Sequence, residues 1–112
     1  MADHRQRAPG FEVHGEVDMA TAPALAERLE AAIRESTGPF VIDLSDVDFL
    51  DSTGLRVLLR GRGLLGREDR PLAVICPHGR IRRVFELSGL STVFTLYGER
   101  PDGWPRSTSG AR

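Results

Sequence analysis

Residues 41–59 constrain the fold of this chain more than any other segment. They begin with an apolar run that is typical of a buried strand, pass through several aspartates, and end with leucines at helical spacing. This order predicts a strand, a short acidic loop and an amphipathic helix that opens with Asp51-Ser52-Thr53-Gly54. Two adjacent hydroxyl groups would then lie at a helix N-terminus, where backbone N–H groups lack partners and the helix dipole is positive. A phosphate group attached there would meet hydrogen-bond donors that the helix already provides.

Strand and helix patterns alternate through the rest of the chain. Apolar or alternating runs predict strands at residues 11–17, 40–44, 71–76 and 92–97. The first helix is expected to have Thr21 as its N-cap and Pro23 in its first turn. The residues expected to face the core from the three helices are Leu25, Leu29, Ala32 and Ile33; Leu55, Leu58, Leu59 and Leu65; and Ile81, Val84, Phe85 and Leu87.

This alternation predicts an α/β fold, with an open, mostly parallel sheet and flanking helices. The almost wholly apolar run at residues 71–76 indicates a strand that is covered on both faces. Right-handed crossovers would bring the strand-to-helix loops, at residues 18–21, 48–54 and 77–79, to one edge of the sheet. Partners of open α/β sheets bind preferentially at that edge.

The composition excludes several classes of protein. With 112 residues, 40% of them hydrophobic and 28% charged, the chain is expected to form a single globular domain. A membrane helix needs about 18 consecutive apolar residues, and the sequence has no such run. The net charge of -1 gives no general attraction to nucleic acid or to an anionic membrane surface. The N-terminus has no signal-peptide core and Cys76 is the only cysteine, so we expect a cytoplasmic protein without an internal disulfide.

The residue types do not favour an enzyme or a metal site. The chain has no lysine, which excludes Schiff-base chemistry, the P-loop lysine and the lysine of phospho-aspartate receiver domains. No nucleophile and base emerge as a pair, and the three histidines are too scattered for metal-ligand spacing. The aspartates of residues 43–51 are interpreted as solvated loop carboxylates. Arg80, Arg82 and Arg83 are interpreted as a solvated helix face.

Two interpretations of Asp51-Ser52-Thr53-Gly54 remain open on physical grounds alone. Asp and Ser both cap helices well, so the segment could be a helix start and nothing more. Capping does not explain Gly54, because glycine in a helix costs about 1 kcal/mol relative to alanine. We therefore expect a close backbone approach at Gly54. A capping box is absent, since Leu55 occupies the position where Glu or Gln would lie.

Three segments in order resemble the STAS domains of bacterial anti-sigma factor antagonists. They are Gly15-Glu16-Val17-Asp18, residues 41–55 with the specific Asp51-Ser52-Thr53-Gly54 motif, and residues 84–90. The resemblance implies a STAS domain at residues 11–97. It leaves a polar segment at residues 1–10, with a possible short antiparallel edge strand, and a tail at residues 98–112 that we expect to be disordered. Trp104 in that tail is expected to be exposed, with an anchoring role as the alternative.

The resemblance also implies a mechanism. In this family the unphosphorylated antagonist binds a serine-kinase anti-sigma factor, which frees a sigma factor. The kinase then phosphorylates the serine after the motif aspartate, here Ser52, with Thr53 as the alternative acceptor, and a phosphatase removes the phosphate. ATP belongs to the kinase, so we expect no cofactor and no catalytic residue in this chain. The residues expected at the partner surface are Asp18, Asp48, Asp51, Ser52, Thr53, Gly54 and Leu55.

A second interpretation belongs to another class of function. STAS domains also serve as scaffold subunits, in stressosome-like assemblies or beside transporters. A shortened first edge strand could in addition allow a homodimer to form through an exposed sheet edge. An enzyme is the least favoured alternative.

Overall fold

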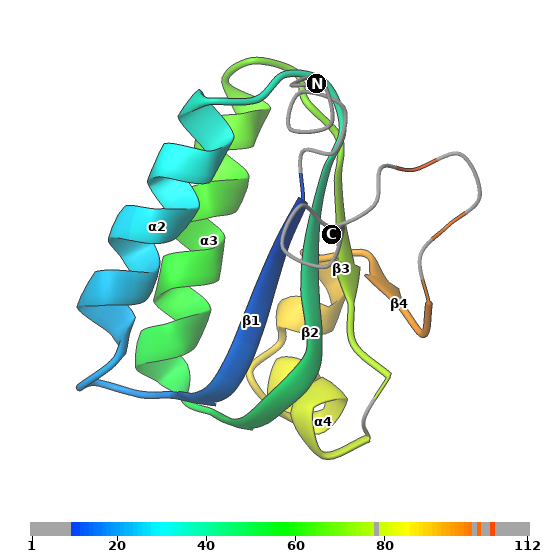
Figure 1. The fold of residues 1–112 in the computed structure, drawn as a ribbon. Coiled ribbons are helices and arrows are strands. Elements are labelled where there is room, and N and C mark those ends of the chain that lie inside the picture. Colours follow the sequence, from blue (N-terminus) through cyan, green and yellow to red (C-terminus); the bar gives the residue numbers. More distant parts are fainter. Residues whose placement is uncertain (1–9, 78, 100, 102–103, 105–112) are drawn as a thin grey trace.

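A four-stranded parallel sheet forms the centre of the computed structural model, which describes residues 10–77, 79–99, 101 and 104 (Figure 1). The strands are β1 (Gly10–Val17), β2 (Phe40–Leu50), β3 (Leu72–Ile75) and β4 (Leu96–Tyr97). They lie in the order β1-β2-β3-β4, and each neighbouring pair is parallel. The predicted open parallel sheet is confirmed. An antiparallel edge strand within residues 1–9 would lie outside the described residues.

The helices that connect the strands lie on one face of the sheet. They are α2 (Ala22–Arg34), α3 (Ser52–Gly66) and α4 (Gly79–Leu87), followed by the short 3-10 helix η1 (Leu90–Thr92). When successive strands are neighbours, right-handed crossovers place every connection on the same side. Helices α2 and α3 pack side by side there (Figure 1). Ile81 and Phe85 of α4 join the same core cluster.

The central strands are buried on both faces, as the apolar pattern predicts. Side chains alternate along a strand, and Phe40, Ile42 and Leu44 of β2 belong to the cluster beneath the helices. Val41 and Ala73 lie outside that cluster and are nevertheless fully buried. The described helices cover the face of the sheet that carries Phe40, Ile42 and Leu44, and they do not cover the opposite face.

Strand β2 is longer than predicted, and the expected acidic loop is wrong. The strand continues through the aspartates to Leu50 because β1 supplies a partner along its whole length. Gly15 and Glu16 are adjacent in β1, whereas their partners Val47 and Phe49 are separated by one residue. Asp48 is therefore the extra residue of a β-bulge, a feature common beside functional sites.

The last predicted strand is mostly wrong. Only Leu96–Tyr97 pairs with β3, while Leu90–Thr92 forms η1. Phe94 enters the core, where its ring meets that of Phe85 edge-to-face at a centroid distance of 5.5 Å. This burial outweighs the strand preference of Thr92 and Val93, which is weak and depends on context.

Two expectations about exposure are also wrong. Leu87 was assigned to the core side of α4, but its side chain is 79% exposed. Trp104 was expected to be exposed and is instead half-buried. Its backbone N–H donates to the carbonyl oxygen of Pro101. Most of the tail after residue 99 lies outside the described residues.

None of the described helices has the length and apolar character that crossing a membrane requires.

Arg70 is a buried arginine that ties the end of α2 to the start of β3. Its guanidinium donates to the carbonyl oxygens of Gly38 and Ile33 and to Oγ of Ser36, each at 2.8 Å. Its fourth partner, the exposed carboxylate of Glu68, is 3.4 Å away. The guanidinium also lies 5.9 Å from the centre of the Phe40 ring.

We expect Arg70→Met to lower the free energy of unfolding by about 3 kcal/mol, because it leaves two carbonyl groups without their charged donor. Glu68→Gln removes only the exposed ion pair and is expected to cost less than about 1 kcal/mol. Urea unfolding of the two variants and the wild type measures both effects. Equal stability of the two variants would contradict the role assigned to Arg70.

Candidate functional site

The ends of β1 and β2 bring the starts of two helices together. Val17 and Leu50 are partners in the ladder, and the N–H of Asp51 donates to the carbonyl oxygen of Val17 at 3.2 Å. The turn after β1 and the first turn of α3 are therefore neighbours at the carboxyl edge of the sheet. The prediction of a shared edge is confirmed for the first two of the three loops, and part of the third lies outside the described residues.

Asp18 and Thr21 lock the turn before α2. One carboxylate oxygen of Asp18 accepts from the N–H groups of Ala20 and Thr21 at 3.0 and 3.1 Å. The hydroxyl of Thr21 accepts from the N–H of Asp18 and donates to the carbonyl oxygen of Glu16. Thr21 occupies the predicted N-cap position, but its side chain makes no capping bond, because the preceding turn already uses the hydroxyl. Pro23 lies in the first turn of α2, as predicted.

Asp51 caps α3. Its side chain accepts from the N–H of Gly54 at 3.1 Å, and its carbonyl oxygen accepts the first helical bond from Leu55. This arrangement satisfies one of the unpaired N–H groups at the helix start. Within the described residues, the N–H groups of Ser52 and Thr53 have no hydrogen-bond acceptor.

Gly54 shows the close approach that its position in the helix predicts. A Cβ atom there would lie 2.6 Å from Cδ1 of Leu50 and 2.6 Å from Cγ1 of Val17. The helix backbone thus rests directly on the ends of β1 and β2, and Gly54 and Leu55 are both buried. Packing, and not a ligand, accounts for this glycine.

The two hydroxyl residues differ in accessibility. Ser52, at the first position of α3, is exposed, whereas Thr53 is half-buried. Ser52 makes no hydrogen bond with its side chain within the described part of the chain. Capping accounts for Asp51 and packing accounts for Gly54, so Ser52 is the motif residue that the fold itself does not use.

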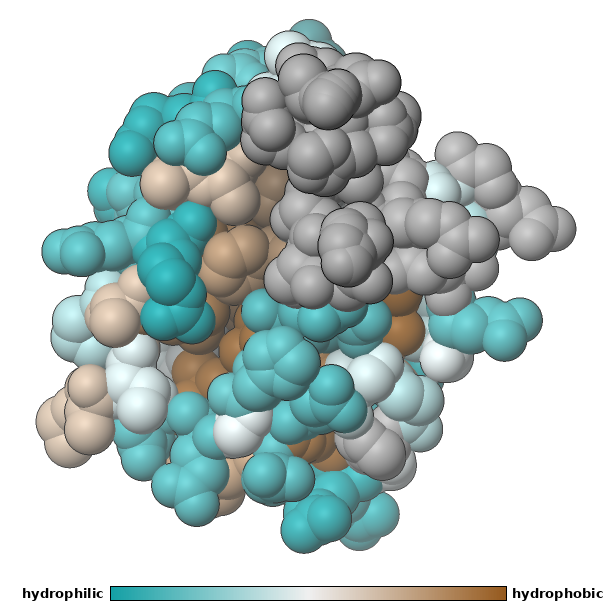
Figure 2. Space-filling model, viewed as in Figure 1, coloured by the Kyte–Doolittle hydropathy of each residue, from teal (hydrophilic) through white to brown (hydrophobic). Residues whose placement is uncertain are grey.

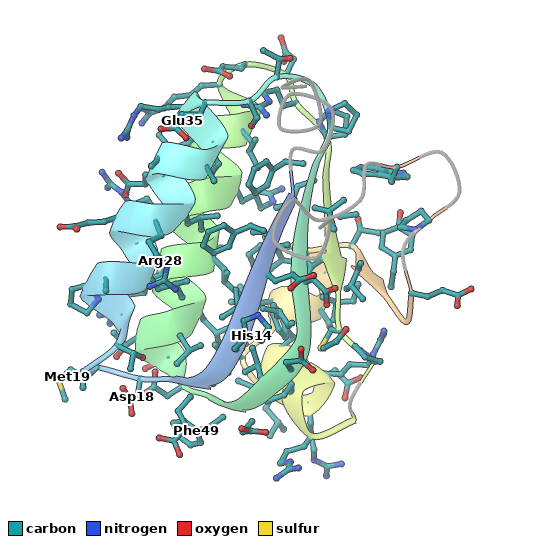
Figure 3. All side chains as sticks on the ribbon, viewed as in Figure 1. His14, Asp18, Met19, Arg28, Glu35 and Phe49 are labelled. Carbon is teal, nitrogen blue, oxygen red and sulfur yellow. The ribbon has the colours of Figure 1, made fainter. Side chains whose placement is uncertain are left out.

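Two apolar residues that the sequence analysis missed are exposed at this edge. Met19 is 75% exposed and Phe49 is 49% exposed. Figure 3 shows both at the same end of the sheet as Asp18. A signal was available, because each is a large apolar residue that directly follows an aspartate in a predicted loop. We call the surface formed by Asp18, Met19, Asp48, Phe49 and Ser52 the Ser52 edge.

The remaining ionisable groups form small, separate contacts. His14 lies 3.3 Å from Asp46 and 3.5 Å from Glu12, and Asp43 accepts from the hydroxyl of Ser45. No three His, Cys, Asp or Glu residues in the described ranges are grouped closely enough to hold a metal ion. His4 and His78 lie outside those ranges.

Cys76 is a buried thiol beneath the helices. Burial raises its pKa, an effect that the positive charge of Arg82 partly offsets. The thiol is therefore protonated at neutral pH, and a protonated thiol is a poor nucleophile.

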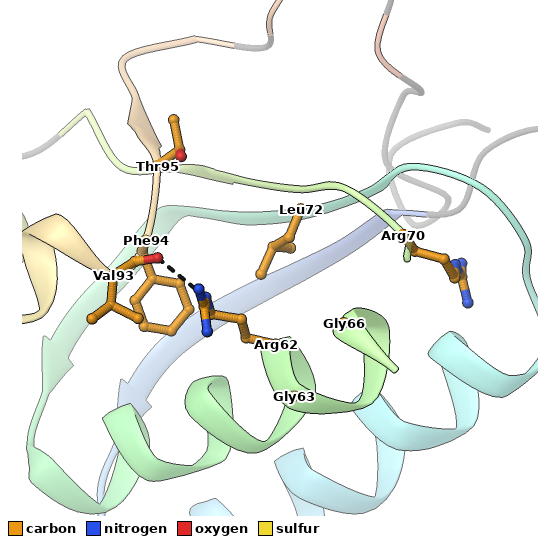
Figure 4. Close-up of a pocket in the computed structure, with 8 residues that line it drawn as sticks. All are labelled: Arg62, Gly63, Gly66, Arg70, Leu72, Val93, Phe94 and Thr95. Atoms are coloured by element: carbon orange, nitrogen blue, oxygen red, sulfur yellow. Dashed lines mark hydrogen bonds between the residues drawn. The ribbon is translucent and has the colours of Figure 1, made fainter. Parts of the chain in front are cut away.

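Two hollows lie away from Ser52. One, of about 310 Å³, lies between α3 and the segment around Phe94, where Arg62 donates to the carbonyl oxygen of Val93 (Figure 4). The other, of about 380 Å³, lies between β1 and α2 and includes Val13, Leu25 and Arg28. Figure 2 shows apolar surface between α2 and the strands, bordered by polar residues.

We expect Gly54→Ala to destabilise the protein by about 1–3 kcal/mol, although alanine favours a helix, because Val17 is β-branched and cannot move aside easily. Gly63→Ala on the same helix is the matched control, since its Cβ would meet nothing within 4 Å. The control is expected to raise stability by about 1 kcal/mol. Urea unfolding distinguishes the two signs, and stabilisation by both substitutions would refute the close packing.

Asp51→Ala is expected to cost about 1 kcal/mol through the lost cap, whereas Asp51→Asn retains a capping oxygen and is expected to stay near wild-type stability. Thermal unfolding of both variants tests this. Equal losses would show that the charge of Asp51, and not its hydrogen bond to Gly54, supports the helix.

Comparisons with known proteins agree with this geometry. The family model of the STAS domain matches residues 1–102. The anti-sigma-F factor antagonist RsfB of Mycobacterium tuberculosis is 33% identical over 102 residues, which cover 91% of this chain and 82% of RsfB. An anti-sigma-B factor antagonist of Staphylococcus aureus is 34% identical over 79 residues, covering 70% and 73% of the two chains.

Solved structures give the same result. An anti-sigma factor antagonist from Mycobacterium paratuberculosis is 41% identical, with a TM-score of 0.72 over 79% of this chain and 74% of the other. SpoIIAA in its unphosphorylated form shares the fold at 20% identity, with a TM-score of 0.66 over 87% and 84% of the chains. The resemblance found in the sequence is confirmed: the chain belongs to the STAS family of anti-sigma factor antagonists.

Proposed function

We propose that this protein is a binding module that phosphorylation of Ser52 switches off. The unphosphorylated form binds a serine-kinase anti-sigma factor through the Ser52 edge, and the sigma factor is released. The kinase then phosphorylates Ser52 and the complex separates, until a phosphatase removes the phosphate. The observation that carries the proposal is that Ser52 is exposed and unused by the fold, while Asp51 and Gly54 beside it have structural roles.

The start of α3 can accept a phosphate without loss of the fold. Phosphorylation adds a charge of about -1.5 to -2 at neutral pH. At a helix N-terminus the dipole favours that charge, and the free N–H groups of Ser52 and Thr53 are donors for its oxygens. The phosphorylated protein is therefore expected to remain folded.

The same phosphate opposes binding of the partner. Met19 and Phe49 offer exposed apolar surface that a partner can bury. A phosphate on Ser52 would have to lose water at an edge that also carries Asp18 and Asp48, and an unpaired charge at an interface is costly. The switch thus acts on the interface and not on the domain.

Several further features belong to the same proposal. Ser52 is favoured over Thr53 as the acceptor because it is more exposed. The protein acts as substrate and binding partner and not as an enzyme, with ATP bound by the kinase. Its work takes place in the cytoplasm, where sigma factors meet RNA polymerase.

We expect Ser52→Ala to bind the kinase with nearly wild-type affinity and Ser52→Asp to bind on the order of tenfold more weakly, a difference of about 1.4 kcal/mol. Calorimetric titration with the serine-kinase anti-sigma factors of the same organism, in ADP, measures both. Thr53→Asp is the control for an added charge one residue away. Equal affinity of the Ala and Asp variants at position 52 would refute the switch.

Incubation with the kinase and ATP is expected to place one phosphate on Ser52, as located by mass spectrometry. Ser52→Ala should accept none, and Thr53→Ala should still be phosphorylated. Phosphate on Thr53 alone would move the acceptor by one residue. A stable complex that ignores phosphate would instead support a scaffold subunit.

A homodimer is the second assembly that the fold permits. Strand β1 is the outermost strand on its side of the described sheet, and an edge strand can pair with another chain. Light scattering at several concentrations would detect such a dimer.

A further inference from the structure

Helix α4 carries an outward stripe that the proposed switch does not use. Arg80, Arg83 and Leu87 lie at positions i, i+3 and i+7, which share one face of a helix. The opposite face holds Ile81 and Phe85, both buried. We call the three outward residues the α4 stripe.

The fold does not depend on the α4 stripe. Arg80 and Arg83 are exposed, and neither makes a hydrogen bond or ion pair with the described part of the chain. Arg82 differs from them, since it is half-buried and donates to the carbonyl oxygen of Cys76 at 3.3 Å. Leu87 is more exposed than Met19 or Phe49.

Arg80 also opposes the helix dipole. The first turn of a helix favours negative charge, and α4 has no acidic residue there. Arg80 therefore works against the helix, and the exposed Leu87 adds nothing to the core. A role outside the folded monomer accounts for both.

The position of α4 connects the stripe to the Ser52 edge. Helix α4 packs against β2, the strand whose end carries Asp48 and Phe49. It lies at the end of the sheet where α2 and α3 begin (Figure 1). The same end of the molecule thus has an acidic part, around Asp18 and Asp48, and a basic part on α4.

We propose that the α4 stripe is the second half of the docking surface for the serine-kinase anti-sigma factor, where it binds an acidic surface that includes an apolar side chain. This inference rests on the proposed function. A protein partner fits better than nucleic acid or lipid, because the carboxylates at the same end repel a phosphate backbone or anionic headgroups. Opposite charges on the two halves of the surface fix the orientation in which the kinase binds, and hence present Ser52 to it.

The test is calorimetric titration of the full-length protein with its kinase, in ADP so that no phosphate is transferred. We expect Arg80→Glu combined with Arg83→Glu to raise the Kd about tenfold or more, and Leu87→Ser to raise it about threefold. The matched control combines Arg34→Glu with Arg67→Glu, which makes the same change in net charge at the other ends of α2 and α3. The control is expected to stay within about twofold of wild type.

Thermal unfolding separates binding from folding. Arg80→Glu places a negative charge in the first turn of α4, where the helix dipole favours it, and Arg83→Glu changes an exposed side chain, so the double variant should melt at or above the wild-type temperature. The inference would be overturned if the 80/83 double variant bound the kinase with wild-type affinity. If Ser52→Asp lost binding in the same experiment, the proposed function would still hold. An equal loss of kinase affinity in both double variants would show that the effect comes from net charge alone, and this result would also overturn the inference. If wild type binds no kinase, the proposed function and this inference both fail.

Discussion

The N-terminus of α3 packs its backbone at Gly54 directly against the side chains of Val17 and Leu50 at the ends of β1 and β2, and the geometry of the functional edge follows from that contact. Gly54 allows it, because a Cβ atom there would overlap Val17 and Leu50. Asp51 holds the same turn from the other side by accepting from the N–H of Gly54. With the backbone fixed at both points, Ser52 projects from a rigid position, as a phosphorylation switch requires.

Adjacent residues at the start of α3 have different roles. Capping and packing use Asp51, Gly54 and Leu55, and within the described residues they leave the hydroxyl of Ser52 and two N–H groups without a partner. In the proposed switch, a phosphate on Ser52 would therefore change the surface beside it, where Met19 and Phe49 are exposed, and not the domain.

The distribution of charge at the carboxyl edge has a second consequence. Acidic residues follow β1 and β2, whereas arginines follow β3 on α4. A chain with a net charge of -1 can in this way present two oppositely charged surfaces at one end. Such a surface selects orientation and partner more than it adds affinity.

Local patterns predicted most of the fold. The alternation of strand and helix, the parallel sheet and the helix start at Ser52 were correct, because periodicity and capping depend on neighbouring residues. The errors came where distant contacts decide. Pairing with β1 extended β2 through the predicted acidic loop, and burial of Phe94 against Phe85 replaced most of the last strand. Leu87 fits a helical apolar pattern, yet the sheet leaves it uncovered.

The sequence by itself determined the family, the order of elements and the motif that carries the candidate phosphorylation site. It could not decide between capping and a switch, since Asp51, Ser52 and Gly54 suit either role locally. Tertiary structure showed which of the three the fold uses: Asp51 caps α3 and Gly54 packs on the strand ends, whereas Ser52 makes no side-chain hydrogen bond within the described residues. Exposure of Met19 and Phe49 was likewise a matter of tertiary structure, because burial depends on what the rest of the chain packs against each side chain.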